Sequence, residues 1–381
     1  MKTEDWVNNL KRCTKCILPE TFPGIRLNDY GVCNYCKDYK KVEVKGEEQL
    51  VSLLSKYRGK GKKYDCIVPI SGGRDSSYVL HQMVKKYDMR VLALTVDNGA
   101  IMPEGYRNID VVTKALEINH VWLKNDDQIK ISQENVKIKF NAWLKKPSIN
   151  TIVPVLNAGD KTMNLRMYKF AHDNGIPLVI GGNNTGNSNL EQEHFKTGFM
   201  GIFPDERGRY TTFDKLRLFI KFGWEFIRNT HNYYWSVFNE YLAGSFVYFF
   251  ESLLKPKDVT PVGFYDYIYW NEKQIMPTVK ELGWKGASDT LATWRIDDSA
   301  YPLIDYIYYS LVGFNEFDEH YSKLIREGQL TREEALNRLV TDRLRIPSMK
   351  ASLKEMNIEV TYFDKVIREY NELLLKKILK D

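Results

Sequence analysis

Apolar runs and helical segments alternate along the chain between residues 64 and 182. "YDCIVPI" (64–70) is an almost continuous apolar run, which is typical of a strand covered on both faces. "DSSYVLHQMVKKY" (75–87) follows with helical spacing of its apolar residues. This alternation predicts an α/β fold with a doubly wound parallel sheet and helices on both faces. The remaining predicted strands are 90–96, 120–123 and 176–182, and the remaining predicted helices are 105–118, 127–145 and 161–174.

The pattern beyond about residue 200 is mainly helical. Thr331 and Glu334 have the spacing of a capping box, and residues 362–381 have the amphipathic pattern of a terminal helix. Aromatic residues are concentrated between about 209 and 270. They indicate either a helical subdomain with an aromatic core or a binding surface.

Length and charge narrow the class of protein only slightly. A chain of 381 residues is long for one hydrophobic core, so we expect two or more units. The 55 basic and 49 acidic side chains leave a net charge of +6, which suits an anionic small substrate as well as a nucleic acid. The N-terminus lacks the apolar stretch of a signal peptide, and no apolar run reaches the roughly 18 residues of a membrane span. We therefore expect a cytoplasmic protein.

Four of the five cysteines lie within the first 36 residues, as Cys13, Cys16, Cys33 and Cys36. Two C-x2-C pairs separated by a short turn-rich segment can place four thiolates around one tetrahedral ion. Because four protein ligands leave no open position, we expect a structural zinc ion. Two disulfides are disfavoured without an export signal, and a redox or iron–sulfur role is the remaining alternative.

"SGGRDSS" follows the first predicted strand, and parallel sheets bind ligands beyond the carboxyl ends of their strands. Gly72 and Gly73 allow a sharp turn that brings backbone N–H groups close to a ligand. The next helix adds its positive end, and hydroxyl donors come from Ser71, Ser76 and Ser77. Together these groups suit a pyrophosphate. The pattern is neither the G-x-x-x-x-G-K-[ST] loop nor G-x-G-x-x-G. By itself it is also compatible with an ordinary turn.

With two further strand ends, this loop resembles the PP-loop of the ATP pyrophosphatases, whose fold is that of the adenine nucleotide α-hydrolases. The resemblance implies that Ser71–Ser76 hold the β- and γ-phosphates of ATP. "TVDNG" (95–99) is similar to the second strand end of that family, where Leu94 and Val96 would meet the adenine. "VIGGNN" is similar to its third element, in which Gly181 and Gly182 face the nucleotide.

The same resemblance implies a magnesium ion that accompanies ATP. Asp75 is then expected to organise the loop or bind Mg²⁺, and Arg74 to neutralise charge on the leaving pyrophosphate. Arg166 and Lys169, on the helix before the fourth strand, are either phosphate-neutralising or ordinary surface cations.

The layout of "CTKC…CNYC", "YDCIVPISGGRDSS", "TVDNG" and "TMNLRMYKFAHDNGIPLVIGGNN" resembles the N-acetyl sugar amidotransferases of bacterial surface-polysaccharide biosynthesis. The resemblance implies an acceptor acetamido group on a nucleotide-linked sugar, such as a UDP-diacetamido uronic acid destined for O-antigen or a related glycan. It also implies ammonia from partner subunits similar to the glutaminase and cyclase of histidine biosynthesis. Cys66 is the one cysteine outside the amino-terminal four, so we expect no internal glutaminase, and the same count argues against a tRNA thiolase.

Three parts are therefore expected: a zinc knuckle (1–45), a PP-loop ATP pyrophosphatase domain (46–200) and a mainly helical substrate- or partner-binding region (201–381). Two alternatives stay open. A tRNA-modifying enzyme of the same fold would grip RNA with the basic residues around the knuckle, and a non-enzymatic scaffold would only bind nucleotide. Further candidates for metal, ammonia or substrate contact, each also compatible with a solvated loop, are Glu191, Glu193, His194, Arg295, Asp297 and Asp298.

Overall fold

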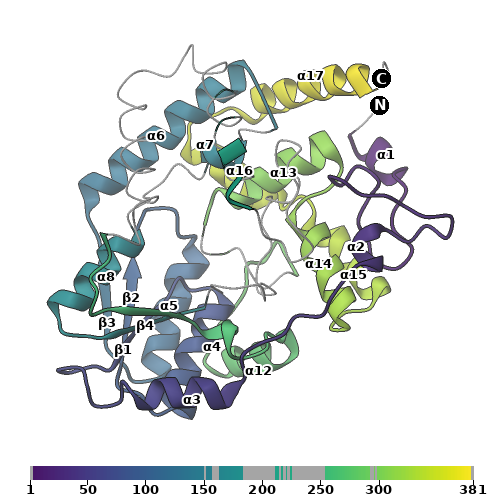
Figure 1. The fold of residues 1–381 in the computed structure, drawn as a ribbon. Helices are drawn as coiled ribbons and strands as arrows, with labels where there is room; N and C mark the ends of the chain where they lie inside the picture. Colours follow the sequence, from purple (N-terminus) through teal and green to yellow (C-terminus); the bar gives the residue numbers. More distant parts are fainter. Residues whose placement is uncertain are drawn as a thin grey trace.

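A five-stranded sheet in which every neighbouring pair is parallel forms the centre of the first half of the chain, in the order β3-β2-β1-β4-β5 (Figure 1). The computed structural model describes residues 3–149, 152–156, 163–182, 254–291, 296 and 298–378, with residues 211–213, 216, 217, 220 and 224. The four predicted strands are confirmed as β1 (Cys66–Pro69), β2 (Val91–Val96), β3 (His120–Leu123) and β4 (Leu178–Gly181).

The fifth strand, β5 (Thr260–Gly263), was not predicted from the sequence. Its four residues "TPVG" contain a proline and a glycine and no apolar run. Among the described strands β5 pairs with β4 alone and so lies at an edge of the sheet, where the missing N–H of Pro261 need not break a ladder. The strand therefore brings the second half of the chain into the sheet of the first.

Helices cover both faces of the sheet, as the alternation of the sequence predicts (Figure 1). Cys66 and Val68 of β1 pack in one core with α3, α4, α5 and α12, whereas Ile67 packs with α8 on the opposite face. The helices concerned are α3 (Glu47–Ser55), α4 (Arg74–His81), α5 (Pro103–Ala115), α8 (Met163–Asp173) and α12 (Glu272–Glu281). The predicted helix 75–87 is α4 continued by a π-helical turn, Gln82–Lys86.

The C-terminal part is helical as expected. Its helices are α13 (Tyr301–Val312), α14 (Glu316–Glu327), α15 (Arg332–Asp342), α16 (Ile346–Glu355) and α17 (Val360–Ile378). The capping box of Thr331 and Glu334 is confirmed at the start of α15, and α14 begins with a second one, Asn315 and Asp318. Gly313 and Gly328 end α13 and α14 in the left-handed conformation that glycine adopts without strain.

A separate core joins the amino-terminal cysteines to the C-terminal helices. It contains Cys13 and Phe22, residues of α6 (Asp126–Lys145) and α7 (Ile152–Leu156), and residues of α13, α16 and α17. The helix prediction 127–145 is confirmed as α6, and α7 was not predicted. The short helix α1 (Thr3–Asn8) precedes the first cysteine pair, and the short helix α2 (Asn34–Lys37) begins directly after Cys33 and contains Cys36. Among the helices that the structure describes, none combines the length and apolarity required to cross a bilayer.

Candidate functional site

The turn after β1 requires a glycine at position 72. Gly72 has φ +81°, and a Cβ atom there would lie 2.2 Å from the carbonyl oxygen of Gly105. The carbonyl oxygen of Gly72 accepts hydrogen bonds from Trp284 Nε1 at 2.8 Å and Asn108 Nδ2 at 3.1 Å. Because these donors come from α5 and from a residue 212 positions away, the turn is fixed by tertiary structure.

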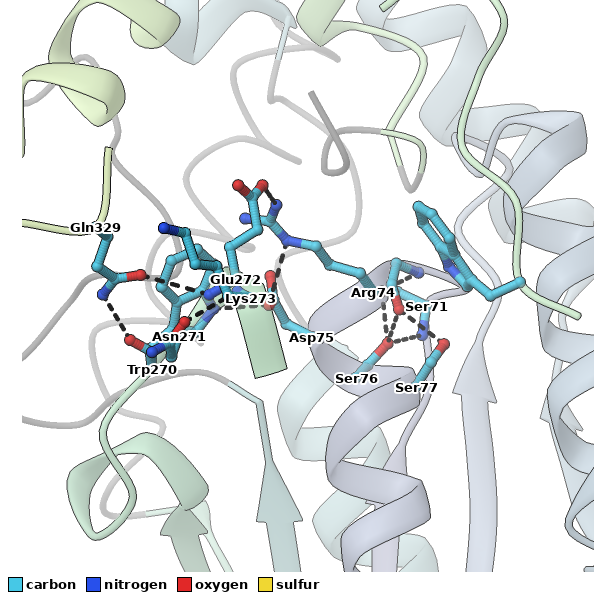
Figure 2. Close-up of polar contacts among 12 residues, drawn as sticks. Ser71, Arg74, Asp75, Ser76, Ser77, Trp270, Asn271, Glu272, Lys273 and Gln329 are labelled. Carbon is cyan, nitrogen blue, oxygen red and sulfur yellow. Dashed lines mark hydrogen bonds and ion pairs between the residues drawn. The ribbon is translucent and has the colours of Figure 1, made fainter. Parts of the chain in front are cut away.

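The serines around the turn hold the start of α4. Ser76 and Ser77 donate their hydroxyls to the carbonyl oxygen of Gly73, at 3.1 and 2.8 Å (Figure 2). Ser76 Oγ also lies 3.3 Å from both the backbone nitrogen and the Oγ of Ser71. Ser77 is fully buried, whereas Ser71 and Ser76 are half-buried and line a cavity. Ser71, Ser76 and the positive end of α4 can therefore offer donors to an anion, and Ser77 secures the turn.

Arg74 and Asp75 both contact the chain segment that opens α12 (Figure 2). The Arg74 guanidinium is fully buried, donates from Nη1 to Glu272 at 2.6 Å and stacks 4.8 Å from the centroid of the Trp270 ring. Asp75 accepts a hydrogen bond from Trp270 Nε1 at 2.8 Å and lies 3.4 Å from Arg74 Nε. Asp75 thus helps to organise the loop, while the Arg74 guanidinium extends away from Ser71 toward Glu272.

A cavity of about 430 Å³ lies at the carboxyl edge of β1, β2 and β4. It brings together the three predicted strand ends: the loop at Ser71 and Gly73–Ser76, Leu94 and Val96 of β2, and Gly181 with Gly182 after β4. A Cβ atom at Gly182 would lie 3.4 Å from the backbone nitrogen of Ser76, so the chain after β4 passes close to the start of α4. The cavity therefore combines phosphate-type donors with an apolar strand edge, as a nucleotide site requires.

The other predicted site residues lie elsewhere or outside the described part of the chain. Arg166 donates from Nη2 to the carbonyl oxygen of Leu123, at 3.3 Å, and is not among the residues that line the cavity. Lys169 is exposed and does not line it either, whereas Asp298 does. Glu191, Glu193, His194, Arg295 and Asp297 lie outside the described residues, as does most of the aromatic segment 209–253.

The four amino-terminal cysteines converge on one point. All five cysteines of the chain are free thiols, and the four sulfurs of Cys13, Cys16, Cys33 and Cys36 lie within 4.8 Å of one another. The separation is 3.9 Å for Cys13 and Cys36 and 3.8 Å for Cys16 and Cys33. A tetrahedral zinc ion with Zn–S bonds of about 2.3 Å requires separations of about 3.8 Å. The cluster therefore fits a zinc ion held by four thiolates.

The surroundings of the cysteine cluster are also compatible with a zinc ion held by four thiolates. The backbone N–H groups of Cys16 and Cys33 donate to Cys13 Sγ at 3.4 and 3.3 Å. The ligands are almost fully buried, so an ion there would have a structural role.

Several residues that shape the loop were missed by reasoning from sequence. Trp270, Glu272, Trp284 and Asn108 all bond to the segment 72–75 from distant positions in the chain. Among these residues, only the tryptophans could have been singled out from the sequence, because a buried indole N–H normally requires a hydrogen-bond acceptor. That signal does not say which acceptor it finds.

A comparison with known protein families gives a match in the C-terminal helical region. Residues 293–375 match the family described as LPS biosynthesis protein WbpG-like, C-terminal domain. An uncharacterized protein of Methanocaldococcus jannaschii is 32% identical over 92 residues, which are 24% of this chain and 32% of that protein. A tRNA-5-methyluridine(54) 2-sulfurtransferase of Thermotoga maritima is 26% identical over 176 residues, 45% of this chain and 52% of that enzyme. The chain thus spans about a third and about half the length of these curated relatives.

Two solved structures are also similar to this chain. NMN synthetase from Francisella tularensis has a TM-score of 0.34 at 14% identity, covering 82% of this chain and 95% of that one. The NH3-dependent NAD synthetase from Campylobacter jejuni has a TM-score of 0.27 at 15% identity, covering 54% and 94%. The match to residues 293–375 agrees with the resemblance to surface-polysaccharide enzymes that the motifs of the first half indicate. The part of the chain from 293 to 375, which includes α13 to α16 and most of α17, is therefore similar to the C-terminal domain of the WbpG-like LPS biosynthesis proteins, and it follows a parallel α/β sheet.

Proposed function

We propose that this protein is an ATP-dependent amidotransferase that converts an acetamido group of a nucleotide-linked sugar into an acetamidino group. The observation that carries the proposal is the cavity at the carboxyl edge of the sheet. There the turn of Ser71–Ser76, the β2 edge at Leu94 and Val96, and Gly181 with Gly182 line one space. The family match supports an acceptor from surface-polysaccharide synthesis, for which a UDP-diacetamido uronic acid is the expected form.

The reaction needs the acetamido oxygen to become a leaving group. That oxygen attacks the α-phosphorus of ATP, and the bond from the α-phosphorus to the bridging oxygen breaks, so pyrophosphate departs. Ammonia then adds to the activated carbon, loses a proton, and AMP leaves with the former acetamido oxygen. The product is an acetamidine, and the overall products are AMP and pyrophosphate.

The chain's own residues would act mainly by holding charge and position. The backbone of the turn, the hydroxyls of Ser71 and Ser76 and the start of α4 would receive the departing pyrophosphate. Leu94 and Val96 would bind the adenine. Mg²⁺ bound with ATP would supply further neutralisation of the phosphates. Asp75 is one of the two carboxylates that line the cavity, and the hydrogen bond from Trp270 orients it at the start of α4.

Ammonia would come from a partner glutaminase and reach the site through a cyclase-like subunit. A glutaminase needs a reactive cysteine thiolate. Four cysteines form the buried cluster, and burial raises the pKa of the Cys66 thiol, which is fully enclosed in β1. None of the five cysteines therefore has the environment of a glutaminase nucleophile. Free ammonium is expected to replace the partner in vitro.

The proposal is tested with purified protein, ATP, Mg²⁺, ammonium chloride and a UDP-diacetamido uronic acid. We expect AMP and pyrophosphate in equal amounts, formed only when both the sugar and ammonium are present, together with loss of one mass unit from the sugar as oxygen is replaced by NH. Formation of ADP and phosphate, or AMP formation that ignores the sugar, would contradict the proposal. A Ser76→Ala variant should show a lower rate, and a Ser55→Ala variant at the exposed end of α3 provides the control.

A second candidate is a tRNA-modifying enzyme, favoured by the 26% identity to the Thermotoga maritima sulfurtransferase. Thiolation enzymes of this fold generally keep cysteines near the nucleotide, and Cys66 is fully buried away from the cavity lining. A gel shift with bulk tRNA separates the two functions. Binding that weakens steeply with salt would favour the tRNA enzyme, and its absence would favour the sugar enzyme.

A further inference from the structure

A larger cavity, of about 810 Å³, adjoins the candidate ATP cavity. One wall is α6, with Lys130, Gln133 and Lys137. The first turn of α13 and the end of α16 also line it, and Figure 1 shows α6, α13 and α16 beyond the same end of the sheet. Its size lies within the usual range of small-molecule sites, about 300–1,000 Å³.

The two cavities share three lining residues: Asn98, Asp298 and Tyr301. The junction is fixed by backbone bonds, because Ser299 N donates to the carbonyl oxygen of Ala100 at 2.7 Å and Ala300 N donates to Asp298 Oδ1 at 2.9 Å. A molecule in the larger cavity can therefore reach the phosphate side of the smaller one. Asp298 and Tyr301 lie within the region 293–375 that matches the WbpG-like family. The helices of that region therefore contribute to the larger cavity.

The lining is polar with a small apolar face. Hydroxyl- and amide-binding groups come from Asn98, Gln133 and Ser299, and Tyr301 and Met356 offer apolar surface of the kind that packs against a sugar ring or base. The charged groups are Lys130, Lys137, Glu134, Asp298 and Glu355. Glu134 lies 3.9 Å from Lys137, and burial raises the pKa of the Glu355 carboxyl. Lys130 is in no ion pair with the described residues.

The positions of Lys130 and Lys137 along α6 determine where the cavity could bind an anion. Lys130 and Lys137 are seven residues apart, so they share one face of the helix and are separated by about 10 Å along its axis. Both line the larger cavity from α6, and Ser71 is not among the residues that line that cavity. Negative charge in the acceptor would therefore lie at the far side of the larger cavity from the departing pyrophosphate, where the two sets of phosphates do not repel each other at close range.

We propose that the larger cavity is the acceptor site and holds a sugar joined to a diphosphate. The sugar's acetamido group points through the junction at Asn98, Asp298 and Tyr301, and the diphosphate lies against α6 near Lys130. This inference rests on the proposed function, because an acceptor that attacks ATP must come within about 3–3.5 Å of the α-phosphorus from a connected space.

Binding is measured without turnover, by calorimetry with a UDP-diacetamido uronic acid in the presence of a nonhydrolysable ATP analogue. Lys130→Glu places repulsive charge at the diphosphate, and Met356→Trp fills the cavity without changing charge. Both variants are expected to weaken sugar binding at least about tenfold, the effect of losing one charge-assisted contact, with the affinity for the ATP analogue unchanged within about threefold. Lys145→Glu, at an exposed position of α6 that lines neither cavity, should bind the sugar like the wild type.

The outcomes separate this inference from the proposed function. Wild-type-like sugar binding in both Lys130→Glu and Met356→Trp, or no sugar binding by the wild type, would overturn the acceptor site. If the wild type forms AMP from the sugar while both variants keep its KM for the sugar, the function holds and the site is wrong. Selective loss of sugar binding in the two variants supports the site even if the bound sugar yields no AMP, in which case the proposed function fails.

Discussion

Glu272 pairs with two arginines, the buried Arg74 and the partly exposed Arg338. Its carboxylate accepts from Arg74 of α4 at 2.6 Å and from Arg338 of α15 at 2.7 Å, and its side chain is 13% exposed. Arg74 has no exposed surface, so its charge depends on this carboxylate, on Asp75 and on the Trp270 ring. The start of the candidate phosphate-binding helix is thereby attached to a helix of the C-terminal region.

The first prediction concerns this carboxylate. Glu272→Gln leaves two guanidinium groups without their shared anion, and we expect a loss of about 3 kcal/mol in the free energy of unfolding, measured by urea titration. The KM for ATP should rise as the start of α4 loses its anchor. Glu281→Gln, at an exposed position on the same helix, is the control. Equal stability of Glu272→Gln and the wild type would show that the buried Arg74 does not need this partner.

The sequence alone predicted the role of an individual residue only where local backbone geometry determines that role. Gly72 is an example, because a sharp turn between a strand and a helix favours a glycine with positive φ. Arg74 shows the limit: its place in the loop indicates a phosphate contact, which stays a prediction. The contacts of its side chain with Trp270 and Glu272, 196 and 198 residues further along the chain, were not predictable. A local pattern contains no information about partners at that separation.

At the scale of elements, pattern reasoning succeeded for buried strands and long helices. β1 and β2 were predictable because strands covered on both faces are continuous apolar runs, and α15 because its capping box is local. The strand β5 was not predictable, because the sequence "TPVG" has no apolar strand pattern. Among the described strands it pairs with β4 alone, and this pairing makes it a strand. The cysteine cluster was predictable because metal-ligand spacing is itself a local pattern.

The cluster gives a prediction for zinc. Wild-type protein should contain one zinc ion per chain by elemental analysis, and Cys33→Ser should lose it. The midpoint of thermal unfolding should fall by several degrees, because the cysteines belong to a core with α13, α16 and α17. Cys66→Ala removes a buried thiol from the sheet instead, and its zinc content should be unchanged. A Cys33→Ser protein with a full complement of zinc would contradict the assignment of the ligands.

At the scale of the whole molecule, the three expected parts share their cores. Arg12 beside the first cysteine pair bonds Asp318 of α14 at 2.5 Å, and Arg332 of α15 donates to the carbonyl oxygens of Cys13 and Cys16 at 3.3 and 3.0 Å. α12 and α15 pack in the same core as the sheet. The boundaries at 45 and 200 stay predictions, since these contacts connect the parts on either side of them.

The most direct test of the central claim follows one oxygen atom. The acceptor sugar is prepared with ¹⁸O in its acetamido carbonyl groups and allowed to react with ATP and ammonium, and the products are analysed by mass spectrometry. We expect one ¹⁸O atom in each AMP, none in pyrophosphate, and one labelled oxygen fewer in the sugar. Unlabelled AMP beside a sugar that keeps all its ¹⁸O would contradict adenylation of the acetamido group.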